Sequence, residues 1–142
     1  MLPYLVFLSR NKNSIKWILQ ECVSNIKLIT PQVLDRQYQL SKIKDTTWVL
    51  YSTFKNGKDA PKLKDTLSHI HHPTLLIWGE NDLIFPPSVG EGLHQKIGGS
   101  KFQMIQKSGH IPMWETPEEV NQAILSFLRE GSYFFSAKMN SS

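Results

Sequence analysis

One aspartate and one histidine occupy positions suited to a catalytic pair. Asp82 lies three residues beyond Gly79, which closes the apolar run PTLLIWG, and His110 lies three residues beyond Lys107, at the end of KFQMIQK. An aspartate held against one imidazole nitrogen fixes the tautomer of the ring. It also stabilises the cation that forms when the other nitrogen takes a proton. The two residues therefore match the acid and the base of a nucleophilic triad.

Each of the two residues also has an ordinary interpretation. An aspartate in a turn commonly accepts hydrogen bonds from its own backbone, and a histidine between a glycine and a proline can be a plain loop residue. Their shared context favours catalysis, because ligands of open parallel sheets bind beyond the carboxyl ends of the strands. The chain between Asp82 and His110 is also long enough for one helical crossover.

Two short apolar runs predict the strands that would carry these loops. The run PTLLIWG, residues 73–79, has the pattern of a strand buried on both faces, and KFQMIQK, residues 101–107, predicts a second strand. Between them, PPSVGEGLHQKIGG predicts a helix that stops at Gly98 or Gly99. Strand, helix and strand in this order indicate an α/β fold with parallel strands.

Helices are predicted on both sides of this unit. After SGHIP, a capping box at Thr116, Pro117 and Glu119 predicts the start of an amphipathic helix that we expect to end at Gly131. The residues before 67 predict further helices, with Ser14 and Thr30 as expected N-caps. These helices fall in the stretches NSIKWILQECV, TPQVLDRQYQL, DTTWVLYSTF and PKLKDTLSHI, the last with Leu63, Leu67 and Ile70 on one face.

The bulk composition is that of a soluble globular protein. Its 142 residues are enough for one domain with a core, and the net charge of +4 is spread along the chain. No nucleic-acid-binding motif accompanies the lysines, and no apolar run approaches the ~18 residues of a membrane span. A single cysteine, Cys22, excludes an internal disulfide, and its spacing predicts a core position. We therefore expect a cytoplasmic protein.

The two motifs together resemble a known family. HPTLLIWGENDLIFPP followed by KFQMIQKSGHIPMWETPEEVNQAILSFL is similar to the C-terminal part of an α/β-hydrolase of the cap-containing serine-hydrolase type. The resemblance covers Pro73 to about Arg129. It implies Asp82 as the catalytic acid and His110 as the base, while Glu115, in WETP, matches a frequent family position without assigned chemistry.

The resemblance implies a division of the chain. Residues 1–66 are expected to form a helical cap, or lid, hereafter the cap segment. Residues 67–131 are expected to be the C-terminal portion of an α/β-hydrolase parallel sheet, with two strands and flanking helices. Residues 132–142 are expected to be a flexible tail.

The nucleophile of this family is missing from the sequence. It sits in G-x-S-x-G, before the acid and the histidine in the chain. The nearest strings, PPSVG and IGGSK, depart from that pattern and follow Asp82, so cap or loop roles suit Ser88 and Ser100 better. The identity of the nucleophile, serine or aspartate, is therefore open.

The family implies hydrolysis of an ester, or of a related acyl or carbon–carbon bond, in a small apolar substrate. No metal or organic cofactor is needed. SHIHHP, with His69, His71 and His72, is better explained as a surface loop than as a metal site. The chain by itself is expected to be inactive. The alternatives are a non-catalytic interaction module and one half of a split hydrolase, which would pair through the exposed sheet edge as a homodimer or with a complementing N-terminal chain.

Overall fold

Two parallel strands form the sheet in the computed structural model, which describes residues 11–56 and 66–139. They are β1 (Leu75–Gly79) and β2 (Lys101–Ile105), with Leu75 opposite Lys101 and Gly79 opposite Ile105. Both strands therefore end at the same edge of the sheet. The predicted pair of parallel strands is confirmed, and the described chain has the α/β class expected from the sequence.

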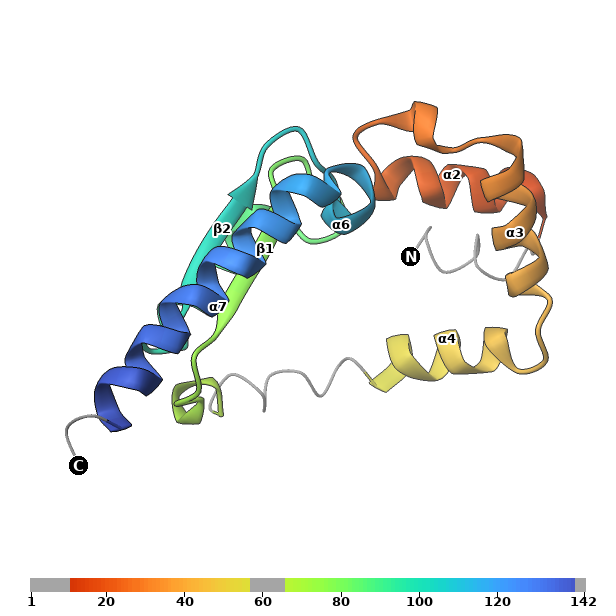
Figure 1. The fold of residues 1–142 in the computed structure, drawn as a ribbon. Coiled ribbons are helices and arrows are strands. Elements are labelled where there is room, and N and C mark those ends of the chain that lie inside the picture. The colour runs from red at the N-terminus through yellow and green to blue at the C-terminus, as the bar shows by residue number, and fades with distance from the viewer. Residues whose placement is uncertain (1–10, 57–65, 140–142) are drawn as a thin grey trace.

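Helices α5 (Pro87–Lys96) and α7 (Pro117–Met139) cover the two faces of this sheet. Side chains alternate between the faces of a strand, and Trp78 and Phe102 point toward α5. A Cβ on Gly90 of α5 would lie within 3 Å of both rings, so that glycine permits a close approach of helix and sheet. On the other face, α7 runs along the strands (Figure 1) and buries Val120.

The described part of the cap segment, residues 11–56, consists of short helices before the sheet. They are α2 (Lys12–Cys22), a 3₁₀ turn at Ile26–Leu28, α3 (Pro31–Ser41) and α4 (Thr46–Asn56). A second 3₁₀ turn at Leu67–His69 leads into β1. In Figure 1, α2 and α3 lie near the end of the sheet where α6 (Pro112–Glu115) is found, and α4 lies apart from the strands.

Most of the predicted helix boundaries in the cap segment are confirmed. Thr30 caps α3 by accepting the Val33 N–H, and Pro31 occupies the first turn. The expected cap at Ser14 is wrong, because the side chain of Asn11 accepts the Ser14 N–H and α2 begins at Lys12. Helix α4, Thr46–Asn56, confirms the helix predicted in DTTWVLYSTF. The helix predicted over PKLKDTLSHI is wrong in its described part, where only the 3₁₀ turn Leu67–His69 forms and Ile70 is extended. Leu63 lies outside the described residues.

The end of the last helix differs from the prediction. Helix α7 begins at Pro117 as predicted, but it passes through Gly131 and continues to Met139. A single glycine costs a helix interior only about 1 kcal/mol relative to alanine, so it need not end the helix. The range 132–142, expected as a tail, is thus helical as far as residue 139.

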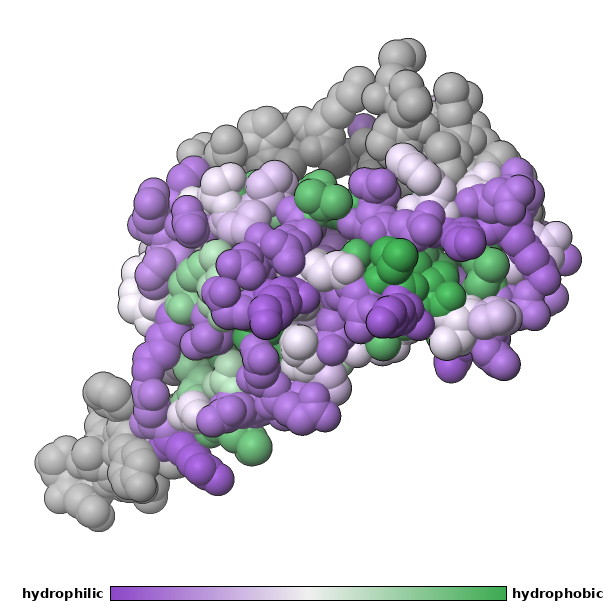
Figure 2. Space-filling view, turned by 90° about the horizontal axis from the view of Figure 1, so that it is seen from above, coloured by the Kyte–Doolittle hydropathy of each residue, from purple (hydrophilic) through white to green (hydrophobic). Residues whose placement is uncertain are grey.

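Apolar side chains are numerous on the surface of the described chain. Figure 2 shows them gathered in patches between hydrophilic residues on the face seen from above. Leu83 and Met113, which flank the predicted catalytic pair in sequence, are 69% and 61% exposed. Large apolar patches mark surfaces that bind ligands or other protein segments. None of the described helices combines the length and the apolarity needed to cross a bilayer.

The loop after β2 lies directly against the end of β1. A Cβ on Gly79 would fall 1.9 Å from the carbonyl oxygen of Gly109 and 2.6 Å from that of Ser108. Hydrogen bonds hold the two segments together: the Asn81 N–H donates to the Ser108 carbonyl at 2.8 Å, and the Glu80 N–H donates to that of Ile105 at 2.9 Å. Only glycine at position 79 allows this contact.

We expect Gly79→Ala to lower the free energy of unfolding by about 3 kcal/mol, because backbone atoms cannot move aside as a flexible side chain can. Urea unfolding measures the change. Gly92→Ala is the matched control. Its Cβ meets nothing within 4 Å in helix α5, so that variant should be neutral or more stable by up to about 1 kcal/mol. Equal effects of the two substitutions would contradict the close contact at Gly79.

Candidate active site

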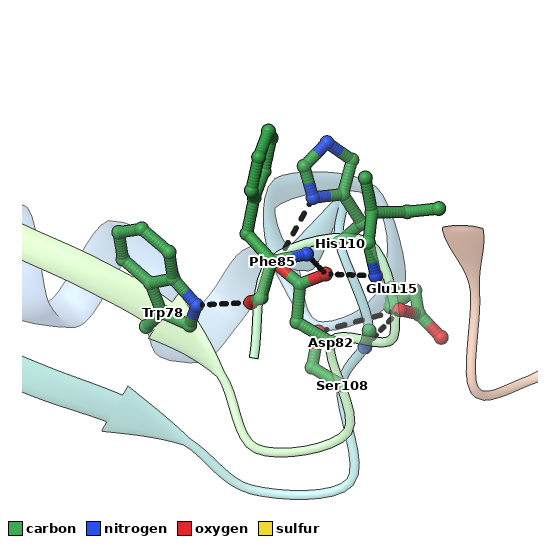
Figure 3. Close-up of polar contacts among 8 residues, drawn as sticks. Trp78, Asp82, Phe85, Ser108, His110 and Glu115 are labelled. Carbon is green, nitrogen blue, oxygen red and sulfur yellow. Dashed lines mark hydrogen bonds and ion pairs between the residues drawn. The ribbon is translucent and has the colours of Figure 1, made fainter. Parts of the chain in front are cut away.

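Asp82 and His110 are brought together as the sequence predicted. The Nδ1 atom of His110 lies 2.9 Å from Oδ2 of Asp82 (Figure 3). The side chain of Asp82 is 5% exposed and that of His110 is 34% exposed. Asp82 is therefore shielded from water while His110 stays accessible. The second ring nitrogen of His110 points away from Asp82 (Figure 3), which leaves it available to exchange a proton.

The other oxygen of Asp82 is held by its own loop. Oδ1 accepts the N–H groups of Ile84 and Phe85, each at 2.9 Å. A buried carboxylate is costly without hydrogen-bond donors, and these two amides together with the imidazole provide them. Asp82 is thus both a turn residue and the partner of His110. The sequence left open whether Asp82 is a turn residue or the partner of a catalytic histidine. The two interpretations are compatible, because Oδ1 binds the turn and Oδ2 binds His110.

Aromatic residues fix the surroundings of the imidazole. The ring of Phe85 lies 5.5 Å from that of His110, centroid to centroid, at an interplanar angle of 49°. The indole N–H of Trp78, on β1, donates to the Phe85 carbonyl at 2.8 Å. This bond ties the acid loop back to the strand that precedes it, so Phe85 has a defined position beside the base.

The histidine loop, Ser108–Ile111, is anchored by residues that the sequence did not assign. The carboxylate of Glu115 accepts hydrogen bonds from the Gly109 N–H and the Ser108 hydroxyl. The backbone N–H of His110 donates to the carbonyl of Cys22, at the end of α2, at 2.8 Å. In the sequence, Glu115 matches a frequent family position without assigned chemistry, and its place just before a helix start carries no information about distant donors.

The thiol of Cys22 is close to this pair but is not an activated nucleophile. It is half-buried rather than a core residue. Burial raises its pKa, and the negative charges of Asp82 and Glu21 raise it further. A thiol with a raised pKa is protonated near neutral pH, whereas the thiolate is the reactive species.

None of the described serines Ser88, Ser100 and Ser108 is placed to serve as the nucleophile for His110. Ser100 Oγ lies 2.8 Å from Nδ1 of His94. Ser100 precedes β2 while His110 follows it, and five residues of strand span roughly 16 Å. Ser88 is exposed in the first turn of α5, and Ser108 is completely buried. In the described chain none of these three serines is hydrogen-bonded to the ring of His110.

Residues that could hold a metal do not assemble in the structure as described. Among residues 11–56 and 66–139, no three or more histidine, cysteine, aspartate or glutamate side chains are placed to share one ion. His69, His71 and His72 lie exposed in the turn that leads into β1.

A pocket opens between the cap segment and the histidine loop. It has a volume of about 380 Å³ and lies between α2, α3 and the residues that follow His110. It is lined by Leu19, Val33, Arg36, Gln37, Ile111 and Trp114. A larger groove of about 700 Å³, between β2 and α7, is lined by neither Asp82 nor His110. The smaller pocket is also lined by neither residue of the pair, but its wall includes Ile111, the residue after His110, and apart from Arg36 and Gln37 its lining is apolar.

Comparison with known proteins identifies the fold that builds this site. The family described as "alpha/beta hydrolase fold" matches residues 10–117, most of the chain. The chain belongs to the alpha/beta hydrolase family. The family predicted from the two motifs is therefore confirmed, and the match begins at residue 10, well before Pro73, where the sequence resemblance began.

Curated relatives of this alpha/beta hydrolase chain are themselves hydrolases. The chain is 37% identical over 73 residues to the 2-hydroxy-6-oxononadienedioate/2-hydroxy-6-oxononatrienedioate hydrolase of Klebsiella pneumoniae, a match that covers 51% of this chain and 25% of that protein. A hydrolase of the same name from Escherichia coli strain K12 is 36% identical over 73 residues, with the same coverage. The chain thus spans about a quarter of the length of these curated relatives.

Solved structures of hydrolases share the fold. A variant of the meta-cleavage product hydrolase CumD from Pseudomonas fluorescens IP01 superposes with a TM-score of 0.73 at 17% identity, over 85% of this chain and 46% of that one. CarC, a serine hydrolase involved in carbazole degradation, superposes with a TM-score of 0.73 at 21% identity, over 84% of this chain and 48% of that one. The alpha/beta hydrolase chain therefore corresponds to about half of such a fold.

The raised pKa of Cys22 leads to a test of its neighbourhood. We expect iodoacetamide to alkylate Cys22 slowly at pH 7.5 and faster as the pH rises, because only the thiolate reacts. Asp82→Asn removes a nearby negative charge, which lowers the pKa and increases the rate at fixed pH severalfold. Glu21→Gln is the control and should have a smaller effect, since Glu21 raises the pKa less than Asp82 does. An unchanged rate in Asp82→Asn would contradict the assigned proximity.

Proposed function

We propose that this chain supplies the acid and the base of a hydrolase that cleaves a carbon–carbon bond in a small, unsaturated carboxylate. The observation that carries the proposal is the hydrogen bond between a buried Asp82 and a more exposed His110. That arrangement suits a base that is oriented on one side and accessible on the other.

The chemistry follows from the two ends of the imidazole. Asp82 accepts a hydrogen bond from the Nδ1–H group, which keeps the proton on Nδ1 and leaves the second nitrogen free to take the proton of an attacking hydroxyl. The hydroxyl oxygen bonds to a substrate carbonyl carbon and forms a tetrahedral intermediate. Collapse of this intermediate breaks the bond to the leaving carbon, which takes the proton from His110. A water molecule, deprotonated in turn by His110, then releases the acyl group as a carboxylic acid.

The attacking hydroxyl comes from outside the assembled pair. The 142 residues contain no G-x-S-x-G, and the described serines near the sheet are bonded or placed elsewhere. Because Asp82 and His110 lie at the carboxyl ends of parallel strands, a nucleophile on a strand end must arrive from a further parallel strand. Within the described chain each strand pairs on one side only, so the free edge of β1 or β2 offers a place for that strand.

The substrate class is proposed from the pocket beside His110. Leu19, Val33 and Trp114 suit an apolar body, and the guanidinium of Arg36 suits a carboxylate. The names of the relatives specify hydrolases of unsaturated dicarboxylates. This favours carbon–carbon hydrolysis over the ester hydrolysis that the sequence left as an equal choice. Residues 1–66 would then be the cap that closes over the substrate, and 67–131 the catalytic half of the sheet.

A complementation assay tests the proposed roles. The chain alone is expected to hydrolyse neither a 2-hydroxy-6-oxo-dienoate nor p-nitrophenyl acetate, and to show no labelling by a fluorophosphonate. Co-expressed with a G-x-S-x-G-bearing N-terminal segment of a family member, it should cleave the dienoate. In that pair His110→Ala should lower kcat by about 10⁴-fold, as expected for loss of a triad member.

His94→Ala is the matched control for that assay, because His94 bonds Ser100 rather than Asp82. It should leave kcat within about twofold of the unsubstituted pair. Activity that survives His110→Ala, or a serine of the isolated chain that is labelled by the fluorophosphonate, would contradict the assignment. Cleavage of the ester but not of the dienoate would retain the triad roles and remove the proposed carbon–carbon specificity.

Binding of a carboxylate to the pocket is a separate prediction. Sorbate, a six-carbon dienoate, should perturb the NMR signals of Ile111 and Trp114 in the isolated chain. Arg36→Gln should weaken its binding about tenfold, because a charge-assisted hydrogen bond is lost. The neutral alcohol of the same skeleton should bind equally to the unsubstituted chain and to Arg36→Gln. The control Lys44→Gln should change the binding of neither sorbate nor the alcohol. Equal binding of sorbate to the Arg36 variant would remove the carboxylate from the proposal.

The main alternative is an interaction module without catalysis. The open edges of the two-stranded sheet and the exposed apolar side chains support pairing with another chain, either a second copy or a complementing N-terminal segment. Complementation distinguishes these cases, since a module without catalysis would bind the segment and generate no activity.

A further inference from the structure

A single carboxylate, that of Glu115, accepts four hydrogen bonds from two separate parts of the chain. Its Oε1 accepts the N–H groups of Ser24 at 2.7 Å and Asn25 at 2.9 Å. Its Oε2 accepts the N–H of Gly109 and, at 3.4 Å, the hydroxyl of Ser108. All four partners are donors, which suits an ionised carboxylate because it has acceptors only.

These donors belong to segments that meet at the catalytic pair. Ser24 and Asn25 follow α2 in the cap segment, and Ser108 and Gly109 belong to the histidine loop. Glu115 is therefore the bridge between the cap segment and the loop that carries His110, across a sequence separation of about 90 residues.

A second hydrogen bond runs parallel to this bridge. The backbone N–H of His110 donates to the Cys22 carbonyl, two residues before Ser24. The junction is tightly packed as well: a Cβ on Gly109 would lie 2.8 Å from the Cys22 carbonyl oxygen and 3.1 Å from both the Ser24 nitrogen and the Glu115 carboxylate. The backbone of His110 thus has little freedom while the end of α2 stays in place.

We propose that Glu115 is a positioning residue, which couples docking of the cap segment to the orientation of His110 against Asp82. If the cap segment moves away to open the pocket at Leu19 and Trp114, the bonds of Glu115 to Ser24 and Asn25 break. His110 then loses its Cys22 partner, and its ring is no longer held toward Asp82. The base is aligned only when the cap is closed over the pocket. The term base rests on the proposed function, whereas the coupling itself does not.

Glu115→Gln tests the coupling in the 142-residue chain. Glutamine has the same shape, but its NH₂ group is a donor and must face either the cap amides or the loop amides. We expect amide hydrogen exchange of His110 and Gly109 to become about 10- to 100-fold faster, the range for a lost hydrogen bond to a charged group. The downfield Nδ1–H proton signal of His110, which reports its bond to Asp82, should weaken or disappear.

Glu118→Gln is the matched control, because it removes an exposed carboxylate three residues further on. It should leave both readouts unchanged. Amides of β1 and β2 serve as the internal reference. An increase of their exchange as large as that of His110 would show a purely structural role and overturn the proposal. An unchanged Nδ1–H signal in Glu115→Gln would overturn it as well.

Gly109→Ala provides a second perturbation that keeps the carboxylate. Its methyl group would press on the Cys22 carbonyl, so it should separate the cap segment from the loop and reproduce the loss of the Nδ1–H signal. Retention of that signal would contradict the coupling. None of these measurements needs a nucleophile or a substrate, so a failed complementation assay would leave the proposed role of Glu115 intact. A negative result for Glu115 would, in turn, leave the proposed triad roles of Asp82 and His110 intact.

Discussion

The contact between the histidine loop and the end of β1 is the constraint on which the site depends. Parallel pairing of β1 with β2 places both strand ends at one edge, and Gly79 lets the carbonyls of Ser108 and Gly109 approach where a side chain would not fit. Without that approach, the loops that carry Asp82 and His110 would lie further apart. The Nδ1 atom of His110 could then not reach Oδ2 of Asp82 at 2.9 Å. The chemistry therefore rests on backbone packing as much as on the two titratable side chains.

Two carboxylates are placed beside this contact, and each is satisfied by backbone amides. Asp82 takes two from its own turn and uses its second oxygen for the imidazole. Glu115 takes amides from the cap segment and from the histidine loop. The first orients the ring and the second fixes the backbone that carries it. The imidazole is thus held from two sides. The carboxylate of Asp82 contacts its ring, and the carboxylate of Glu115 binds the loop that carries it.

The described chain has a site whose walls are incomplete. Few apolar side chains are fully buried, while Leu83, Phe85 and Met113 beside the pair are exposed. Each strand has one free edge within the described residues. These features agree with a chain that covers about half of the solved hydrolases of its fold. A further segment paired at a sheet edge would bury apolar surface, which is the main stabilising term in folding, and under the proposed function it would also bring the nucleophile.

The sequence by itself determined the strands, the crossover helix between them, the start of α7 and the proximity of Asp82 and His110. These depend on local patterns: apolar runs, helical periodicity, and polar residues placed just after strands. It misjudged the cap at Ser14, where the side chain of Asn11 caps the helix instead, and the end at Gly131, because a single glycine costs a helix only about 1 kcal/mol. Only the tertiary structure decided the role of Glu115, the bond from His110 to Cys22, and the partner of Ser100. These contacts join groups that are brought together by the packing of the cap segment and the sheet. The spacing of residues along the chain does not encode that packing.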